Sequence, residues 1–104
     1  MLPPLPRVSS SLGENEVIVE RQGDWLSARV GDELVMMSAA KGNYVGLSEV
    51  GARIWEIIET RTPVETICAR LLTEFEVSPE TCRAEVEAFL NELQAHGAVA
   101  LEAN

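Results

Sequence analysis

The first half of the chain alternates apolar and polar residues with a period of two, which is the pattern of strands that pack one face on a core. Short runs rich in β-branched and aromatic residues show this pattern at 16–21, 25–30, 34–37 and 44–47. Because the turns between the runs are short, we expect neighbouring runs to pair antiparallel in one small sheet of three or four strands. In such a meander the run at 44–47 is the last strand and lies at an edge of the sheet.

The second half changes to a period of 3.6, which predicts helices. Ser48 is placed to cap the first helix, whose apolar stripe covers residues 50–58. Thr62 and Pro63 are expected to cap and open a second helix, with its stripe over residues 64–75.

A third helix is predicted from a repeat of the same start signal. Ser78 and Pro79 open it, and His96 and Gly97 close it. Residues 98–101 are expected to form a short extended tail. Strands followed by three helices predict an α+β domain whose content is winged-helix-like, although here the sheet precedes the helices.

The length and composition predict one domain. A chain of 104 residues, 46% of them hydrophobic, is long enough for one core and short for two. Residues 1–13 hold three prolines and three consecutive serines and show no period, so we expect a flexible N-terminal tail there. The domain is then expected to cover residues 14–104.

The charge of the chain argues against nucleic acid as a partner. The formal net charge is −9, and the eight Lys and Arg residues are scattered along the sequence, so a polyphosphate would be repelled. No apolar run reaches membrane-spanning length, and the prolines near the start differ from the continuous apolar segment of a signal peptide. We therefore expect a cytoplasmic protein that binds neither nucleic acid nor membrane.

The sequence offers no catalytic set of nucleophile, base and stabilising group. The one histidine, His96, ends a predicted helix, where a cation interacts favourably with the helix dipole. Cys68 and Cys82 fall at core-facing positions, without the CxxC or His-rich spacing of a metal site. We expect no enzyme activity, no metal and no cofactor. The competing hypothesis, a small enzyme that uses one of these cysteines, requires a thiol that reacts readily in the folded state.

The predicted edge strand and the third helix carry the functional signal. The run from Tyr44 to Leu47 has no internal proline and no inward charge, so it lacks the usual protection against pairing with another chain. On the third helix one apolar face has two polar flanks; the face comprises Cys82, Val86, Phe89 and Leu93, one flank Glu85 and Glu92, and the other Arg83, Glu87 and Gln94. Either flank can line a peptide groove. The same residues also have ordinary roles. The strand edge can be covered within the fold, the apolar face of the helix can pack in the core, and the charged flanks can face solvent.

Three blocks of the sequence carry a family resemblance, namely ELVMMS, GNYVGLSEVGARIWEII and TPVETICARLLTEFEVSPETCRAEVEAFLNELQAHGAV. The most specific part is the pattern Tyr-x-Gly-Leu-x-x-x-Gly-x-x-Ile-Trp around Tyr44, Gly51 and Trp55. From about Trp25 to Leu101 the chain resembles the PqqD-like family, the leader-peptide recognition elements of ribosomally made, modified peptides. Within that family it looks most like the small standalone proteins of lasso-peptide clusters. Members often carry Asn where this chain has Ser48, and both residues cap helices.

The resemblance implies a noncatalytic fold of three strands and three helices that binds the leader of a precursor peptide. The leader adds as a strand beside the third strand and lies against the third helix. Carried onto this sequence, the peptide-binding residues are the strand backbone of Tyr44, Val45, Gly46 and Leu47 and the helix wall of Cys82, Glu85, Val86 and Phe89. The implied enzyme partners are a leader-cleaving protease and a macrolactam-forming cyclase.

Other functions stay open at the level of sequence. A protein of pyrroloquinoline quinone synthesis, or a partner of a radical-SAM peptide-modifying enzyme, fits the same resemblance. A winged-helix DNA-binding regulator shares the content of short strands and three helices. However, its recognition helix should carry several basic residues, whereas residues 79–96 contain Arg83 against four glutamates.

Overall fold

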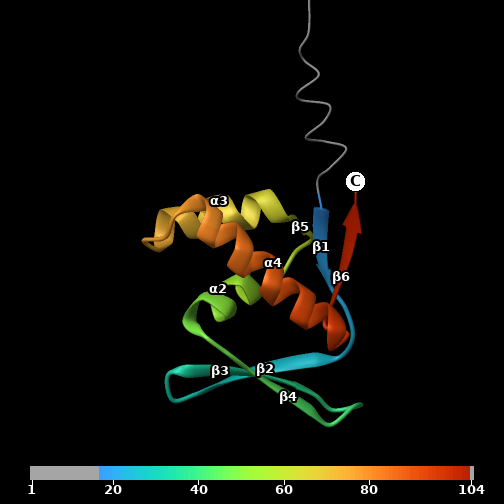
Figure 1. Ribbon diagram of the computed structural model, residues 1–104. Helices are drawn as coiled ribbons and strands as arrows, with labels where there is room; N and C mark the ends of the chain where they lie inside the picture. The colour runs from blue at the N-terminus through green and yellow to red at the C-terminus, as the bar shows by residue number, and fades with distance from the viewer. Residues whose placement is uncertain (1–16, 104) are drawn as a thin grey trace, which may run out of the picture.

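The computed structural model of the protein describes residues 17–103, so the predicted tail at 1–13 lies outside the described part. Two small antiparallel sheets and three helices make up this part of the chain (Figure 1). The strands are β1 (Val17–Arg21), β2 (Trp25–Val30), β3 (Glu33–Ser38), β4 (Asn43–Leu47), β5 (Thr62–Pro63) and β6 (Val99–Ala103). The helices are α2 (Glu49–Ile57), α3 (Val64–Glu74) and α4 (Pro79–Ala95). The predicted α+β class is confirmed, while the likeness to a winged helix stays a prediction.

The sheet that matters for the site is the meander β2-β3-β4, which has the predicted order. Gly31 and Gly42 adopt φ angles of +64° and +70° in its two turns, a conformation that suits glycine. Met36 pairs with Val45 and both are buried, because this face of the sheet packs against the helices. The opposite face leaves Tyr44 exposed.

The four-stranded version of the meander is wrong. β1 pairs with β5 and β6 in a second sheet, which stands beside the helices in Figure 1. The backbone N–H of Gln22 donates to the carbonyl of Ala98 at 2.9 Å, so the chain continues along the segment that leads into β6 instead of folding back as a hairpin. The predicted extended tail at 98–101 is confirmed from Val99 onward as the start of β6, and a strand therefore also follows the helices.

Two of the three predicted helix caps are confirmed. The hydroxyl oxygens of Ser48 and Ser78 accept hydrogen bonds from backbone N–H groups three residues later, at 3.1 and 3.2 Å. The predicted cap at Thr62 is wrong, because that residue belongs to β5 and its hydroxyl donates to the carbonyl of Thr60 at 2.6 Å. Pro63 takes the N-cap position of α3 without a side-chain hydrogen bond.

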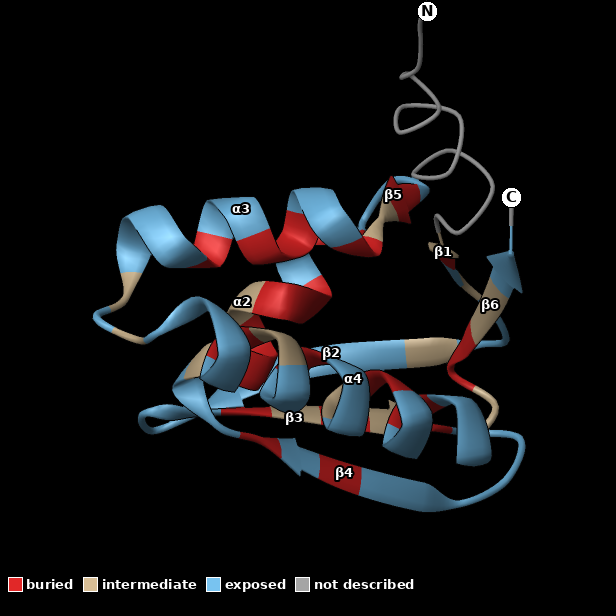
Figure 2. Cartoon of the chain, turned by 45° about the horizontal axis from the view of Figure 1, so that its top comes forward, coloured by how far each residue is buried: buried red, intermediate tan, exposed pale blue. Residues whose placement is uncertain are grey.

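The core lies between the inner face of the β2-β3-β4 sheet and the buried stripes of the helices (Figure 2). Helix α2 connects the two sheets, since it follows β4 directly and its Trp55 contacts β1. The guanidinium of Arg21 donates to the carbonyl of Trp55 and lies 4.0 Å from the centre of its ring. This contact holds the last turn of α2 against β1.

Candidate functional site

Strand β4 is an edge strand within the described part of the chain, where only β3 pairs with it. Figure 2 shows its outer side without a neighbouring strand, and α4 passes above β4 in Figures 1 and 2. An unpaired edge presents a row of backbone N–H and C=O groups that can pair with another chain. The strand identified from the sequence therefore has the required exposure.

The hairpin between β2 and β3 indicates which backbone groups of β3 point toward β4. Its two-residue loop at 31–32 places Val30 opposite Glu33. Residues that flank such a loop form a hydrogen-bonded pair, and the direction of hydrogen bonding alternates along an antiparallel strand. The backbone N–H and C=O groups of every second residue of β3, starting at Leu34, therefore point toward β4.

The register then indicates which groups of β4 stay free. The β3 residues directed toward β4 stand opposite Leu47, Val45 and Asn43. The backbone N–H and C=O groups of Tyr44 and Gly46 point the other way, to the open edge. Of the four strand residues expected to pair with a peptide, these two are thus the ones positioned to form the ladder.

The side chains of β4 leave that edge accessible. Val45 and Leu47 are buried beneath the helices, while Tyr44 is 71% exposed on the outer face. A Cβ atom placed on Gly46 would meet nothing within 4 Å, and the φ angle of this glycine is not positive. An extended peptide can therefore approach the strand without displacing a side chain at Gly46.

Two adjoining hollows run along α4 between this helix and the start of α2, and we call them together the α4 groove. The first, of about 290 Å³, is lined by the α3–α4 loop residues Phe75 and Val77 and by Cys82 and Val86. The second, of about 390 Å³, is lined by Ser48, Val50, Gly51 and Ile54 around the start of α2 and by Glu85, Ala88, Phe89 and Glu92 of α4. Both hollows include Val50 and Glu85, so they form one continuous depression that begins where β4 ends.

The contact between Gly51 and Phe89 sets the spacing of the two groove walls. A Cβ atom on Gly51 would lie 3.0 Å from Cε1 of Phe89, so only glycine allows the ring this close. The N–H of Gly51 is the group that Ser48 caps. The end of β4, the start of α2 and the middle of α4 are thereby fixed relative to one another.

The structure distinguishes the two flanks of the third helix. The flank with Glu85 and Glu92 lines the α4 groove. The opposite flank lines a separate hollow with β1 and β6, and there the guanidinium Nε of Arg83 donates to the carboxylate of Glu87 at 2.8 Å. The expected helix wall therefore divides into exposed and buried members. Glu85 is exposed and Phe89 is half-buried, while Cys82 is 3% and Val86 0% exposed and form the floor.

Part of the groove comes from elements that the sequence did not indicate as peptide-binding. Val50 and Gly51 of α2 and Phe75 and Val77 of the α3–α4 loop line it. The available signal was the glycine inside a helical pattern, which marks a close approach.

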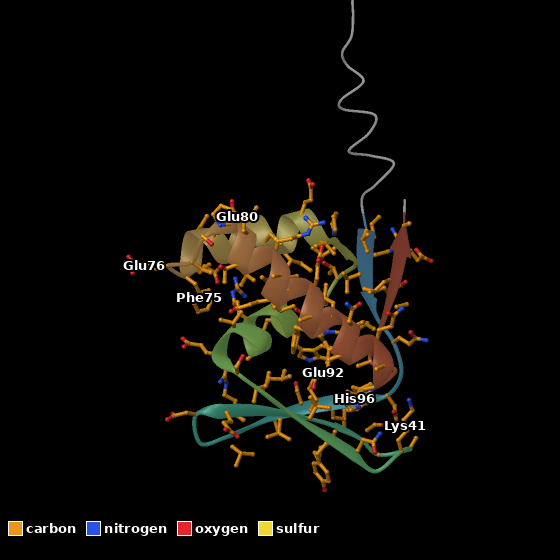
Figure 3. All side chains as sticks on the ribbon, in the orientation of Figure 1. Lys41, Phe75, Glu76, Glu80, Glu92 and His96 are labelled. Atoms are coloured by element: carbon orange, nitrogen blue, oxygen red, sulfur yellow. The ribbon has the colours of Figure 1, made fainter. Side chains whose placement is uncertain are left out.

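A hydrogen bond closes the fold near the other end of α4. The Nζ of Lys41, in the β3–β4 turn, donates to the carbonyl of His96 at 3.1 Å. Figure 3 shows these two residues at the opposite end of α4 from Phe75, Glu76 and Glu80. The turn that starts β4 is thereby held against the end of the helix.

Both cysteines, Cys68 and Cys82, are free thiols and are buried. Burial raises the pKa of the Cys68 thiol, and the thiolate is the form that acts as a nucleophile. Within residues 17–103 no three histidine, cysteine or acidic side chains gather as a metal site. Nor does any helix of that range have the length and apolar character needed to cross a membrane.

Comparison with known proteins shows which family the chain belongs to. No curated protein matches the chain. The solved structure "TbiB1 in complex with the TbiA(beta) leader peptide" is 29% identical, with a TM-score of 0.68, over 77% of this chain and 93% of that one. "Lasso peptide synthetase B1 complexed with the leader peptide" is 16% identical, with a TM-score of 0.67 over 79% of this chain and 96% of that one, and this likeness shows the fold. Residues 33–99 match the family described as Coenzyme PQQ synthesis protein D (PqqD). Because this match spans more than half of the chain, it confirms the resemblance seen in the sequence, and the protein belongs to the PqqD family.

Proposed function

We propose that this protein is a noncatalytic adaptor that binds the leader region of a ribosomally synthesised precursor peptide and presents the precursor to a separate enzyme. The observation that carries this function is the open edge of β4 next to the α4 groove. Both similar solved structures are complexes with a leader peptide, and one of them is 29% identical to this chain.

The leader binds as an added strand. Its backbone pairs with the N–H and C=O groups of Tyr44 and Gly46, which supplies affinity without reading its sequence. Successive side chains of a strand point to opposite faces, so every second leader side chain is directed toward the helices and the α4 groove. The half-buried Phe89 and the floor of Cys82 and Val86 offer these side chains an apolar surface.

The adaptor acts by bringing the precursor peptide close to the enzyme that processes it. An adaptor that holds the leader raises the effective concentration of the precursor at an enzyme that binds the adaptor, so two modest contacts act as one strong contact. The enzyme is a leader peptidase or another peptide-modifying enzyme. The likeness to a leader-bound lasso peptide synthetase B1 favours a lasso pathway over pyrroloquinoline quinone synthesis or a radical-SAM partner. The four glutamates of the third helix argue against a DNA-binding regulator.

Reconstitution tests the proposal. The protein is mixed with a precursor peptide and a leader peptidase, and cleavage is followed by mass spectrometry. The expected result is faster cleavage with the protein present, no cleavage by the protein alone, and loss of the acceleration when the leader is scrambled upstream of the cleavage site. Equal rates with and without the protein would refute the adaptor function, as would product formed by the protein alone.

A further inference from the structure

The carboxylates of the α4 groove have no basic partner within residues 17–103. The described cations are engaged elsewhere: Arg29 and Arg53 pair with Glu56 and Glu74, Arg61 with Glu20 and Glu102, and Arg83 with Glu87. The guanidinium of Arg21 donates to the carbonyl of Trp55, and the Nζ of Lys41 donates to the carbonyl of His96. The positive charge of Arg70 contributes to lowering the pKa of the Glu74 carboxyl. Glu85 and Glu92 line the groove without an ion pair in this range.

We propose that Glu85 and Glu92 select leaders that carry a basic residue two positions from an apolar residue; this inference rests on the proposed function and names the class of leader it takes. The two glutamates flank an apolar centre, because Ala88 and Phe89 lie between them on the same hollow. A ligand that fits this surface needs an apolar side chain in the middle and positive charge beside it.

The spacing of a bound strand matches that arrangement. Glu85 and Glu92 are seven residues apart on α4, which corresponds to about 10.5 Å along the helix. Side chains on one face of a strand repeat every two residues, at about 6.7 Å. A leader side chain on Phe89 therefore has neighbours, two positions before and after it, within reach of one carboxylate each. Lysine and arginine suit these positions, since their stems cover apolar surface while their charge stays in water.

The expected effect is a change of specificity more than of total affinity. Exposed ion pairs contribute modestly, so each glutamate is expected to change the affinity for a basic leader a fewfold. Reversing both charges turns attraction into repulsion, and we expect about a tenfold or greater loss for a basic leader, with a gain for an acidic one.

Selection from a phage-displayed library of random dodecapeptides tests this directly. The library is selected in parallel on the full chain, on Glu85→Lys/Glu92→Lys and on Glu85→Gln/Glu92→Gln. The expected enriched peptides carry Lys or Arg two positions from an apolar residue on the unchanged protein. On the charge-reversed variant the same positions are expected to become acidic, and on the amide variant to show no charge preference.

Two further variants make the outcome specific. Glu80→Lys changes the net charge from a position on α4 outside the groove lining, so it is expected to leave the basic preference unchanged. Gly46→Pro blocks the strand edge and is expected to abolish enrichment. Enriched peptides without a charge preference, or a preference that Glu80→Lys shifts equally, would overturn this inference and leave the proposed function standing. Enrichment that does not depend on Gly46, or no enrichment at all, would overturn both.

Discussion

Replacing Gly46 by proline removes one backbone N–H from the open edge of β4 and changes no other residue. The alternation of hydrogen bonds directs this N–H away from β3, so the change costs no bond within the sheet. Proline is tolerated on edge strands in this orientation. The matched control is Gly46→Ala, because a Cβ atom at this position meets nothing within 4 Å and alanine keeps the N–H.

The expected loss follows from the ladder bond at Gly46. A hydrogen bond of this kind contributes about 0.5–1.5 kcal/mol, and the leader carbonyl left without a donor costs about 1–3 kcal/mol more if it is buried. Because part of that carbonyl stays accessible to water, we expect a loss of about 2–3 kcal/mol, which corresponds to roughly 30- to 150-fold weaker binding. The alanine variant is expected to bind within about twofold of the parent.

Fluorescence anisotropy with a labelled synthetic leader peptide measures both affinities, and circular dichroism with thermal denaturation verifies that both variants fold. Equal leader affinity in two folded variants would show that the edge at Gly46 is not where the leader binds. The N–H of Gly46 would then not be a group that pairs with the leader.

Three further predictions concern other parts of the structure. Gly51→Ala crowds the Phe89 ring, which costs about 1–3 kcal/mol, and gains about 1 kcal/mol of helix propensity. We therefore expect the free energy of unfolding to fall by up to about 2 kcal/mol, as measured by thermal denaturation. Adding Phe89→Leu, which removes the crowding, should recover the lost stability. The Arg53 side chain donates to Glu74 at 2.7 and 2.9 Å and lowers the pKa of that carboxyl. This stabilisation is present above the unfolded-state pKa of the carboxyl and is lost as pH falls through the folded-state pKa; Arg53→Ala should return the NMR titration midpoint of Glu74 toward its usual value, and an unchanged midpoint would refute the pairing. The buried Cys68, whose thiol pKa is raised, should react slowly with iodoacetamide until the protein is denatured, whereas rapid labelling of the folded protein would support the thiol-enzyme hypothesis.

Local signals in the sequence were sufficient for the three described helices and for every described strand except β5. Ser48 and Ser78 cap helices because their hydroxyl oxygens satisfy nearby N–H groups, a short-range effect that single residues reveal. The pairing of β1 with β6 joins residues about eighty positions apart, and no local pattern encodes it. Thr62 shows the same limit, since its pairing with Val19 keeps it in β5 and out of the cap position of α3.

The candidate site was predictable in part for a similar reason. The edge strand follows from the order of the hairpins, so the run from Tyr44 to Leu47 could be identified from the sequence. The selection of Tyr44 and Gly46 within it depends on the register between the strands. Helical periodicity identifies the apolar face of α4 but treats its two flanks alike. The choice of the Glu85 flank depends on the contact of Phe89 with Gly51, which is a tertiary contact. The burial of Val86 likewise depends on packing, and a charge placed there would disrupt the core before it tested the groove.

Amide hydrogen exchange along β4, measured with and without a saturating leader peptide, tests directly whether the leader adds as a strand at this edge. Exchange of the N–H groups of Tyr44 and Gly46 is expected to slow markedly when the leader adds as a strand. Those of Val45 and Leu47 should change less, because they are directed toward β3 already. Unchanged exchange at Tyr44 and Gly46 under saturating leader would contradict strand addition at this edge.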